Sequence, residues 1–277
     1  MRLFAGLLIL VAGLFGTAGP TTAQTAQPMV STCLAIAETL PGARYAAYTP
    51  GPLPLVYAGG VATNEVRITF ATHSTYLIES AGGVTIATDY AGFAGPGIVP
   101  TAVTMNQAHS THFTNFPDPA IAHVFRGWNP EGGPARHREM VGDVLIRNVP
   151  TDIDRFGQFI ADGNSIFIFE VAGLCIGHLG HLHHMLTDSH FAEIGRLDIV
   201  MVPVDGGMTM THTGMSEIVK RLRSSIILPM HRFGNLNRFI AMMGDTVEVE
   251  VRQERYIKVS LNTLPRRPTI TVLQGHN

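Results

Sequence analysis

Charged side chains are scarce in this sequence of 277 residues. Asp, Glu, Lys and Arg make up 14% of the chain, and 19 Lys and Arg against 21 Asp and Glu give a formal net charge of −2. A chain without a basic excess gives no reason to expect nucleic acid or an anionic membrane surface as its partner. Hydrophobic residues reach 45%, so the chain can bury a large core and does not have the composition of a disordered protein.

Cysteine is nearly absent, since only Cys33 and Cys175 occur. Neither belongs to the CxxC spacing that is typical of redox or zinc-binding pairs. In an oxidising compartment the two could form a disulfide that closes a long loop. Because Cys175 lies in the apolar run GLCIG, a buried free thiol is an equally good interpretation, and the sequence leaves both open.

Long hydrophobic runs are missing after the first residues. Arg2 is followed by the uncharged apolar run Leu3–Phe15, which has about the length of a signal-peptide core and is followed by small residues. A membrane anchor is the alternative, but the run is short for a bilayer span. We therefore expect a periplasmic or secreted protein that has no membrane association after cleavage. Its parts would be a signal peptide (1–23), an N-terminal extension and linker (24–60) and one domain (61–277).

Short strands dominate the first part of the predicted domain. VRITFAT, TYLIES and VTIATD follow one another around a Gly-Gly turn, which indicates a hairpin or meander, and AVTMNQ, AHVFRGW, VLIRNVPT, SIFIFEVAG and LCIGHLG continue the pattern. From about residue 187 strands alternate with helices, since Met215, Ile218, Val219 and Leu222 have the spacing of one helix face. This order predicts two packed sheets with helices outside them.

Histidine is the abundant functional residue, with 13 copies. His109 and His112 follow AVTMNQ, His178 and His181 follow LCIG, and His231 follows SIILPM. Imidazole is a common transition-metal ligand, and α/β sheets bind ligands at the carboxyl ends of their strands. The pattern therefore predicts a metal site. The alternative is that these histidines only pack and form hydrogen bonds, which is how we interpret His123, His137, His190, His212 and His276.

The order of six segments resembles the metallo-β-lactamase superfamily, and within it the ascorbate-6-phosphate-lactonase-like and related metal-dependent hydrolases. The segments are ITFATHSTYLIES, TIATDYAG, AVTMNQAHSTHF, LCIGHLGHLHH, DIVMVPVDGG and SIILPMH, and they span about residues 64–235. The resemblance implies an α/β fold, namely an αββα sandwich of two mixed β-sheets flanked by helices. It also implies an active site at the edge between the two sheets.

The resemblance assigns roles to residues, but the motifs differ from those of the family. The HxHxDH signature falls on residues 107–112, so Gln107 stands in place of its first His and Thr111 in place of its Asp. His181 stands in place of a bridging Asp. The implied metal ligands are His109, His112, His178, His181 and His231. The implied catalytic groups are His73 and Asp89, and Gln107, Thr111, His183 and His184 would surround the ligands.

With both carboxylate ligands replaced, three imidazoles, those of His112, His181 and His231, fit one Zn²⁺ with an open fourth position. The expected function is a metal-dependent hydrolase that uses a metal-bound water on a small-molecule ester, lactone, amide or phosphoester. One alternative is a catalytically degenerate protein that binds metal or ligand in the periplasm. Another transition metal is a third interpretation, because an all-imidazole site also suits Cu or Fe.

Overall fold

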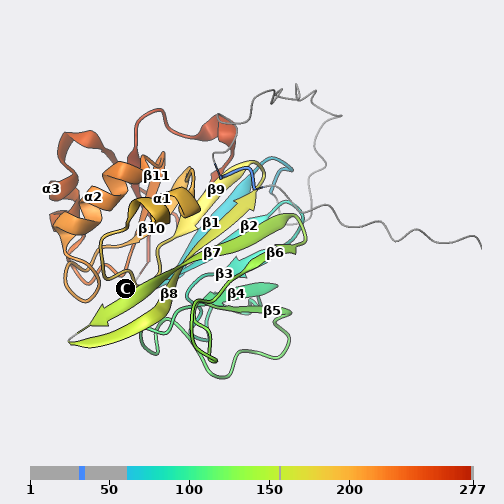
Figure 1. Ribbon diagram of the computed structural model, residues 1–277. Helices are drawn as coiled ribbons and strands as arrows, with labels where there is room; N and C mark the ends of the chain where they lie inside the picture. Colours follow the sequence, from blue (N-terminus) through green and yellow to red (C-terminus); the bar gives the residue numbers. More distant parts are fainter. Residues whose placement is uncertain (1–30, 35–60, 156, 276–277) are drawn as a thin grey trace, which may run out of the picture. The chain divides into compact units, whose positions relative to one another are not determined.

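The computed structural model describes residues 31–34, 61–155 and 157–275. The expected signal peptide and most of the expected linker lie outside these ranges. The described residues fall in one compact unit, in which two β-sheets pack face to face (Figure 1). None of the described helices is long and apolar enough to cross a membrane.

The first sheet has six strands and is mixed. Across the sheet they are β13 (Tyr256–Val259), β1 (Val66–Thr72), β2 (Thr75–Ser80), β3 (Thr85–Ala87), β4 (Ala102–Met105) and β5 (His123–Arg126). Strands β13, β1, β2 and β3 pair antiparallel, whereas β3, β4 and β5 pair parallel. The strands expected around VRITFAT and TYLIES are confirmed residue for residue.

The second sheet has eight strands. They are β12 (Glu248–Val251), β14 (Thr269–Val272), β11 (Ile226–Met230), β10 (Ile199–Pro203), β9 (Leu174–His178), β8 (Gln158–Val171), β7 (Val144–Arg155) and β6 (Arg138–Val141). The strands from β12 to β9 run parallel, and β8, β7 and β6 continue as an antiparallel meander. The two mixed sheets of the expected sandwich are therefore confirmed.

Helices cover the eight-stranded sheet. They are α1 (Asp188–Ile194), α2 (His212–Leu222) and α3 (Leu236–Met243), with 3-10 turns η1 (Gly244–Thr246) and η2 (Leu261–Thr263). Ile218 of α2 and Phe239 of α3 are fully buried and belong to one hydrophobic cluster with Val200 and Ile227 of the sheet. On the outer face of the six-stranded sheet, the described loops supply the cover instead, through Tyr90, Ala94, Phe113 and Trp128.

The main core lies between the two sheets. Val66, Ile68 and Phe70 alternate along β1 and are fully buried, as the period of two in a strand requires. Strands β10 and β11 are buried at every position, because one face meets the core and the other meets the helices. Parallel pairing brings the carboxyl ends of β3 and β4 to one edge of the molecule, and those of β9, β10 and β11 to one edge of the second sheet.

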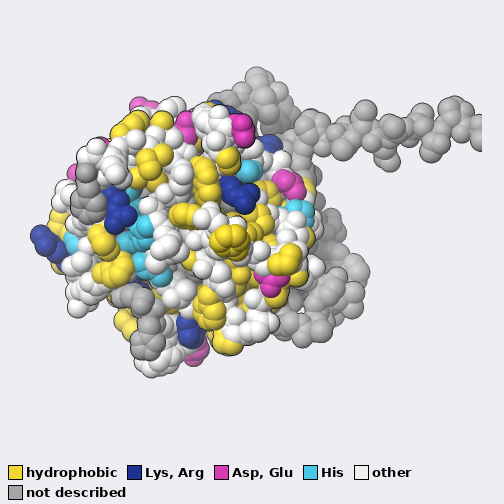
Figure 2. All heavy atoms as spheres, turned by 90° about the horizontal axis from the view of Figure 1, so that it is seen from below, with side chains coloured by type: hydrophobic (Ala, Val, Ile, Leu, Met, Phe, Trp, Pro, Cys, Tyr) yellow, Lys and Arg dark blue, Asp and Glu magenta, His cyan; other side chains and the backbone are white. Residues whose placement is uncertain are grey.

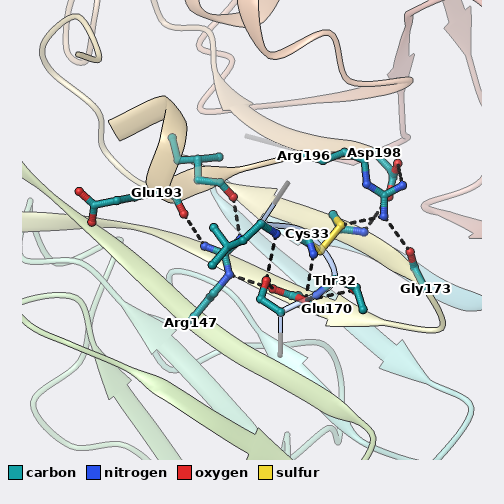
Figure 3. The surroundings of a disulfide bond; sticks show 12 residues. Thr32, Cys33, Arg147, Glu170, Gly173, Glu193, Arg196 and Asp198 are labelled. Atoms are coloured by element: carbon teal, nitrogen blue, oxygen red, sulfur yellow. Dashed lines mark hydrogen bonds and ion pairs between the residues drawn. A yellow bond between two sulfur atoms is a disulfide. The ribbon is translucent and has the colours of Figure 1, made fainter. Parts of the chain in front are cut away.

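A disulfide joins Cys33 to Cys175 at the start of β9, with a sequence separation of 142 residues and 5.8 Å between the two Cα atoms. This settles the alternative that the sequence left open. Beside it the buried carboxylate of Glu170 accepts hydrogen bonds from Ser31 Oγ, Thr32 N and Arg147 Nε (Figure 3). We call residues 31–33 with Arg147, Glu170 and Cys175 the N-terminal clasp.

Candidate metal centre

Two tight turns bring histidines from the two sheets together. His73 lies in the turn between β1 and β2, and His231 directly follows β11. Both have positive φ angles, 42° and 51°, which are uncommon for residues other than glycine and mark sites that deserve a functional explanation. The backbone N–H of His231 donates to the carbonyl of His73 at 3.0 Å, so the two turns hold each other in place.

Four imidazoles converge at this edge. One ring nitrogen from each of His73, His109, His112 and His231 lies within 4.8 Å of the others. His109 and His112 come from the loop after β4, as the sequence predicts. Histidine side chains gather on this face of the molecule, next to Lys or Arg and hydrophobic side chains (Figure 2). We call these four residues and His181 the histidine cluster.

Four nitrogens of the histidine cluster are buried and unsatisfied, and three of them are Nε2 atoms. The Nε2 atoms of His73, His112 and His231 have no hydrogen-bond partner among the described residues. Buried polar groups in native proteins almost always have a partner, and each exception calls for an explanation such as a bound ion. Three such nitrogens in one cluster are therefore suited to a ligand that accepts imidazole lone pairs.

Buried carboxylates lie on the other side of two of these rings. Asp89 Oδ2 is 2.6 Å from His112 Nδ1, and Asp205 Oδ2 is 2.8 Å from His231 Nδ1. The second contact is short, but its geometry is poorly aligned for a hydrogen bond. A carboxylate beside Nδ1 favours a proton on that nitrogen and leaves the Nε2 lone pair available, the arrangement found behind metal-bound histidines. Asn106 Nδ2 donates to Asp89 at 2.8 Å and fixes this carboxylate.

His181 adds a fifth imidazole. Its Nε2 is 3.2 Å from His109 Nε2, and its Nδ1 is 2.6 Å from His183 Nε2. Its ring centroid is 4.7 Å from that of His112. Asn164 Oδ1 accepts the backbone N–H of His181 at 2.7 Å and holds the residue in this position.

The titration of these groups favours a cation. Burial, then the neighbouring histidine charges, lowers the pKa of His73 to about 3, and burial and His112 lower the pKa of His109 to about 4. Burial alone would raise the pKa of Asp89 and Asp205, but nearby His178 and the His112 hydrogen bond hold the pKa of Asp89 below its usual range, and the His231 contact helps to lower that of Asp205. Ionised carboxylates beside neutral imidazoles leave negative charge that a divalent ion would balance.

The structure gives several of the predicted site residues other surroundings. His178 is fully buried, and its Nε2 donates to Ser74 O at 2.8 Å while its Nδ1 accepts the Gly180 N–H at 3.1 Å, so both ring nitrogens are engaged. The Nε2 of His184 accepts the N–H of Asp152, away from the histidine cluster. The predicted role of His178 as a ligand is therefore not supported by its geometry.

The remaining predicted residues lie near the histidine cluster in different ways. Thr111 Oγ1 is 2.8 Å from His109 Nδ1, and His183 contacts His181 as described above. Gln107 is exposed, and its backbone N–H donates to Gly163. Asp89 is fully buried between His112 and Asn106, so its place is that of a positioning group, and His73 stands among the candidate ligands.

Sequence analysis missed the supports of the site. Asp205 accepts three backbone N–H groups of its own loop, at 2.5–2.9 Å, while it faces His231. Its position two residues after the end of β10, like that of Asn106 directly after β4, was the available signal. Histidines interpreted as ordinary have ordinary partners: His123 pairs with Glu139, His137 with Arg126 O and His212 with Val204 O. His276 lies outside the described residues.

Residues 67–231 match the sequence model of the β-lactamase superfamily domain. No curated protein matches the chain. A solved structure from Thermotoga maritima, described as a Zn-dependent hydrolase of the metallo-β-lactamase superfamily, is 25% identical and has a TM-score of 0.56, with 76% of this chain and 100% of that chain covered. None of these matches tests the lactonase-like branch, which stays a prediction.

Two further structures share the fold at lower identity. One is described as a metal-dependent hydrolase from Parabacteroides distasonis, with 14% identity, a TM-score of 0.50, and 68% of this chain and 92% of that chain covered. The other is a diiron β-hydroxylase from Streptomyces venezuelae, with 9% identity and a TM-score of 0.51. The match covers 77% of this chain and 55% of that chain. Because hydrolase and hydroxylase chemistry occur on this one fold, the reaction must be argued from the site.

Proposed function

Because this chain belongs to the metallo-β-lactamase superfamily, we propose that it is a metal-dependent hydrolase whose ion is held by the histidine cluster. The observation that supports this most strongly is that His73, His112 and His231, each with a buried, unsatisfied Nε2, belong to a group of histidines that bring one ring nitrogen each within 4.8 Å of the others. An unsatisfied buried polar group costs about 1–3 kcal/mol, so three of them in one cluster are difficult to explain by packing alone. The proposed substrate is a small ester, lactone, amide or phosphoester.

Zinc is the ion we favour, in one copy. Catalytic zinc sites use three protein ligands and keep one position open, and the histidine cluster offers more than three imidazoles. The Nε2 separation of 3.2 Å between His109 and His181 is close to that of two ligands on a tetrahedral zinc, given Zn–N bonds of about 2.0–2.1 Å. Copper or iron is the alternative for an all-imidazole donor set.

Zinc at this position would act as a Lewis acid and make water a nucleophile at neutral pH. The protein's own groups would orient the ligands. Asp89 holds a proton on His112 Nδ1. The 2.6 Å separation between His181 Nδ1 and His183 Nε2 requires one proton between them, and this contact would fix the direction of the His181 ring.

Hydrolysis assays with matched variants test the proposal. The zinc-loaded protein is assayed on aryl esters, lactones, amides and phosphodiesters, beside His231→Ala, Asp89→Asn and the control His123→Ala. We expect His231→Ala to lose metal and turnover. Asp89→Asn should keep the fold and bind zinc roughly 10–100-fold more weakly, and His123→Ala should behave as wild type because its partner Glu139 is exposed.

Two outcomes would reject parts of the proposal. Turnover that survives in His231→Ala would exclude the histidine cluster as the active site. A zinc-loaded protein without turnover on any of these substrates would favour the alternative of a metal-binding protein that has lost its chemistry.

We also infer that the protein acts outside the cytoplasm on a small-molecule partner. The Cys33–Cys175 disulfide supports this, because structural disulfides persist in oxidising compartments, as does the apolar run Leu3–Phe15 in the sequence. Cell fractionation tests the location. Recovery of the chain in the cytoplasm with residues 1–23 still attached would contradict it.

A further inference from the structure

The turn after β11 places an aromatic side chain beside the histidine cluster. The ring of Phe233 meets that of His231 edge-on at a centroid distance of 4.7 Å and that of His73 at 5.2 Å. The residue is nevertheless 47% exposed. Phe233 therefore forms a hydrophobic wall that touches two candidate metal ligands and leaves much of its surface available.

The backbone at Phe233 is unfavourable for a bulky side chain. Its φ is 37°, within the left-handed region that glycine adopts readily, and the next residue is a glycine with φ 75°. Burial does not account for a phenylalanine here, since its ring is about half exposed. Residues in such conformations persist when the surrounding structure fixes them, and they occur often at ligand sites.

Contacts on both sides fix the turn. The guanidinium of Arg232 lies 4.4 Å over the Phe70 ring and donates to Leu273 O and Gly275 O. Asn235 Nδ2 donates to the carbonyl of Asp205 at 2.7 Å. The position of Phe233 next to the histidine cluster is thus set before any ligand binds, which reduces the entropy lost on binding.

The carboxylates next to the histidine cluster are not exposed beside Phe233. The carboxylates of Asp89 and Asp205 are buried against the Nδ1 side of their histidines. An apolar group that covers Phe233 would not desolvate these two carboxylates, which are already buried, and burial of the apolar surface is favourable.

We propose that Phe233 is a specificity-determining residue that selects substrates with an apolar acyl or aryl group next to the hydrolysed bond. This inference rests on the proposed hydrolase function and names the substrate class within it. A substrate whose scissile group lies at the imidazoles of His73 and His231 would have its neighbouring apolar group against the exposed side of Phe233.

Binding of straight-chain carboxylates to the zinc-loaded protein tests this without turnover. The head group stays constant from butyrate to octanoate, so the change in affinity along the series measured by calorimetry reports the environment of the chain. Full burial of each methylene would give roughly a fourfold gain. For a chain covered on one side we expect octanoate to bind roughly tenfold more tightly than butyrate.

Three variants test whether the preference for the longer carboxylate depends on the Phe233 side chain. Phe233→Ala should reduce the tenfold preference to roughly twofold or less, and Phe233→Leu should keep most of it, because leucine retains an apolar side chain. Phe93→Ala is the matched control, since Phe93 is also 47% exposed and lies in the loop between β3 and β4. Zinc content is measured in each variant, so that weaker binding caused by loss of the ion is distinguished from weaker binding caused by loss of the apolar contact.

The inference would be overturned if Phe233→Ala kept the full preference for octanoate over butyrate, or if the wild type showed no such preference. Ester hydrolysis separates it from the proposed function. If binding depends on chain length but no ester is hydrolysed, the proposed hydrolase function is rejected and the apolar binding site at Phe233 is retained. If acetyl and octanoyl esters are hydrolysed with equal kcat/KM, both by the wild type and by Phe233→Ala, the proposed selectivity of Phe233 is rejected and the hydrolase function is retained.

Discussion

The N-terminal clasp and the histidine cluster both bury polar side chains, but they satisfy them differently. In the N-terminal clasp, Glu170 accepts from residues 31 and 32 and from Arg147, whose other nitrogens donate to Glu193 O and Ile194 O (Figure 3). In the histidine cluster, the buried Nε2 atoms of His73, His112 and His231 have no hydrogen-bond partner among the described residues. The first region satisfies its polar groups within the protein, whereas the second offers imidazole nitrogens to a ligand.

This difference predicts two kinds of variant. Changes in the N-terminal clasp should lower the free energy of unfolding by the same amount with and without metal. Changes in the histidine cluster should alter metal affinity and should reduce stability chiefly in the metal-loaded protein, because ligand binding to the folded state adds to its stability.

Removal of the disulfide should have the largest effect. The bond closes a loop across a sequence separation of 142 residues, and the chain-entropy relation gives about 5 kcal/mol for a loop of that length. The double variant Cys33→Ser, Cys175→Ser should lose about this much free energy of unfolding in urea titrations. Metal content should stay the same. A loss below about 1 kcal/mol, or a loss of metal, would break the distinction between the two regions.

Breaking the buried ion pair between Arg147 and Glu170 should have the next largest effect on stability. Glu170→Ala leaves the Arg147 guanidinium buried, with 5% of its side chain exposed, and an uncompensated buried charge costs about 3–5 kcal/mol. Glu170→Gln keeps an acceptor oxygen and should be less destabilising. Urea titrations with and without zinc provide the measurement. Equal stability of wild type and Glu170→Ala would show that the pair is dispensable.

A substitution at Gly180 should affect both stability and the site. A Cβ there would lie 2.3 Å from Asn164 Oδ1 and 2.5 Å from Asn106 Nδ2, and φ is 61°. These amides hold the His181 backbone and Asp89. Gly180→Ala should therefore cost about 1–3 kcal/mol and weaken zinc binding roughly tenfold or more.

The control for that substitution is Gly207→Ala, because no heavy atom lies within 4 Å of its Cβ position. It should change the free energy of unfolding by no more than about 0.5 kcal/mol. If Gly180→Ala behaves like Gly207→Ala in urea titrations and zinc binding, the amide supports of the site are not required.

The metal-free protein should also show a pH dependence of its stability. The pKa of His73 is lowered to about 3 and those of His109 and His183 to about 4, against an ordinary value of 6.5. Between these values the unfolded chain binds more protons than the folded one, so the free energy of unfolding rises with pH and falls as pH drops below 6.5. Urea midpoints should therefore be lower at about pH 5 than at about pH 7.5.

The double variant His73→Ala, His109→Ala should show a weaker dependence over the same range, because two of the groups that resist protonation are gone. A dependence equal to that of wild type would place its origin in other residues.

Sequence patterns predicted the elements that have a clear period. β1 and β2 were predicted to the residue, and α2 follows the spacing of Met215, Ile218, Val219 and Leu222. The β7–β8 hairpin was predicted too short, because residues 158–161 of β8 are all exposed and have no burial period. α1 has seven residues, too few for a helical period to be visible.

The sequence predicted which strand ends carry the histidines, but not the directions of all the side chains. Strand ends brought His109, His112 and His231 together as expected, since parallel strands end at one edge. The direction of an imidazole depends on its neighbours in space, however. His178 turns to Ser74 and Gly180, whereas His73 joins the candidate ligands because its turn hydrogen-bonds to that of His231. Such contacts between distant segments have no period in the sequence.

The metal content of the mature protein, measured by mass spectrometry beside His112→Ala, His231→Ala and the control His123→Ala, tests the difference between the two regions most directly. We predict about one zinc per chain in wild type and in the control, and loss of the ion in both cluster variants. No metal in wild type under conditions that load other members of the superfamily, or full retention in both cluster variants, would contradict the proposal that the histidine cluster is a metal centre.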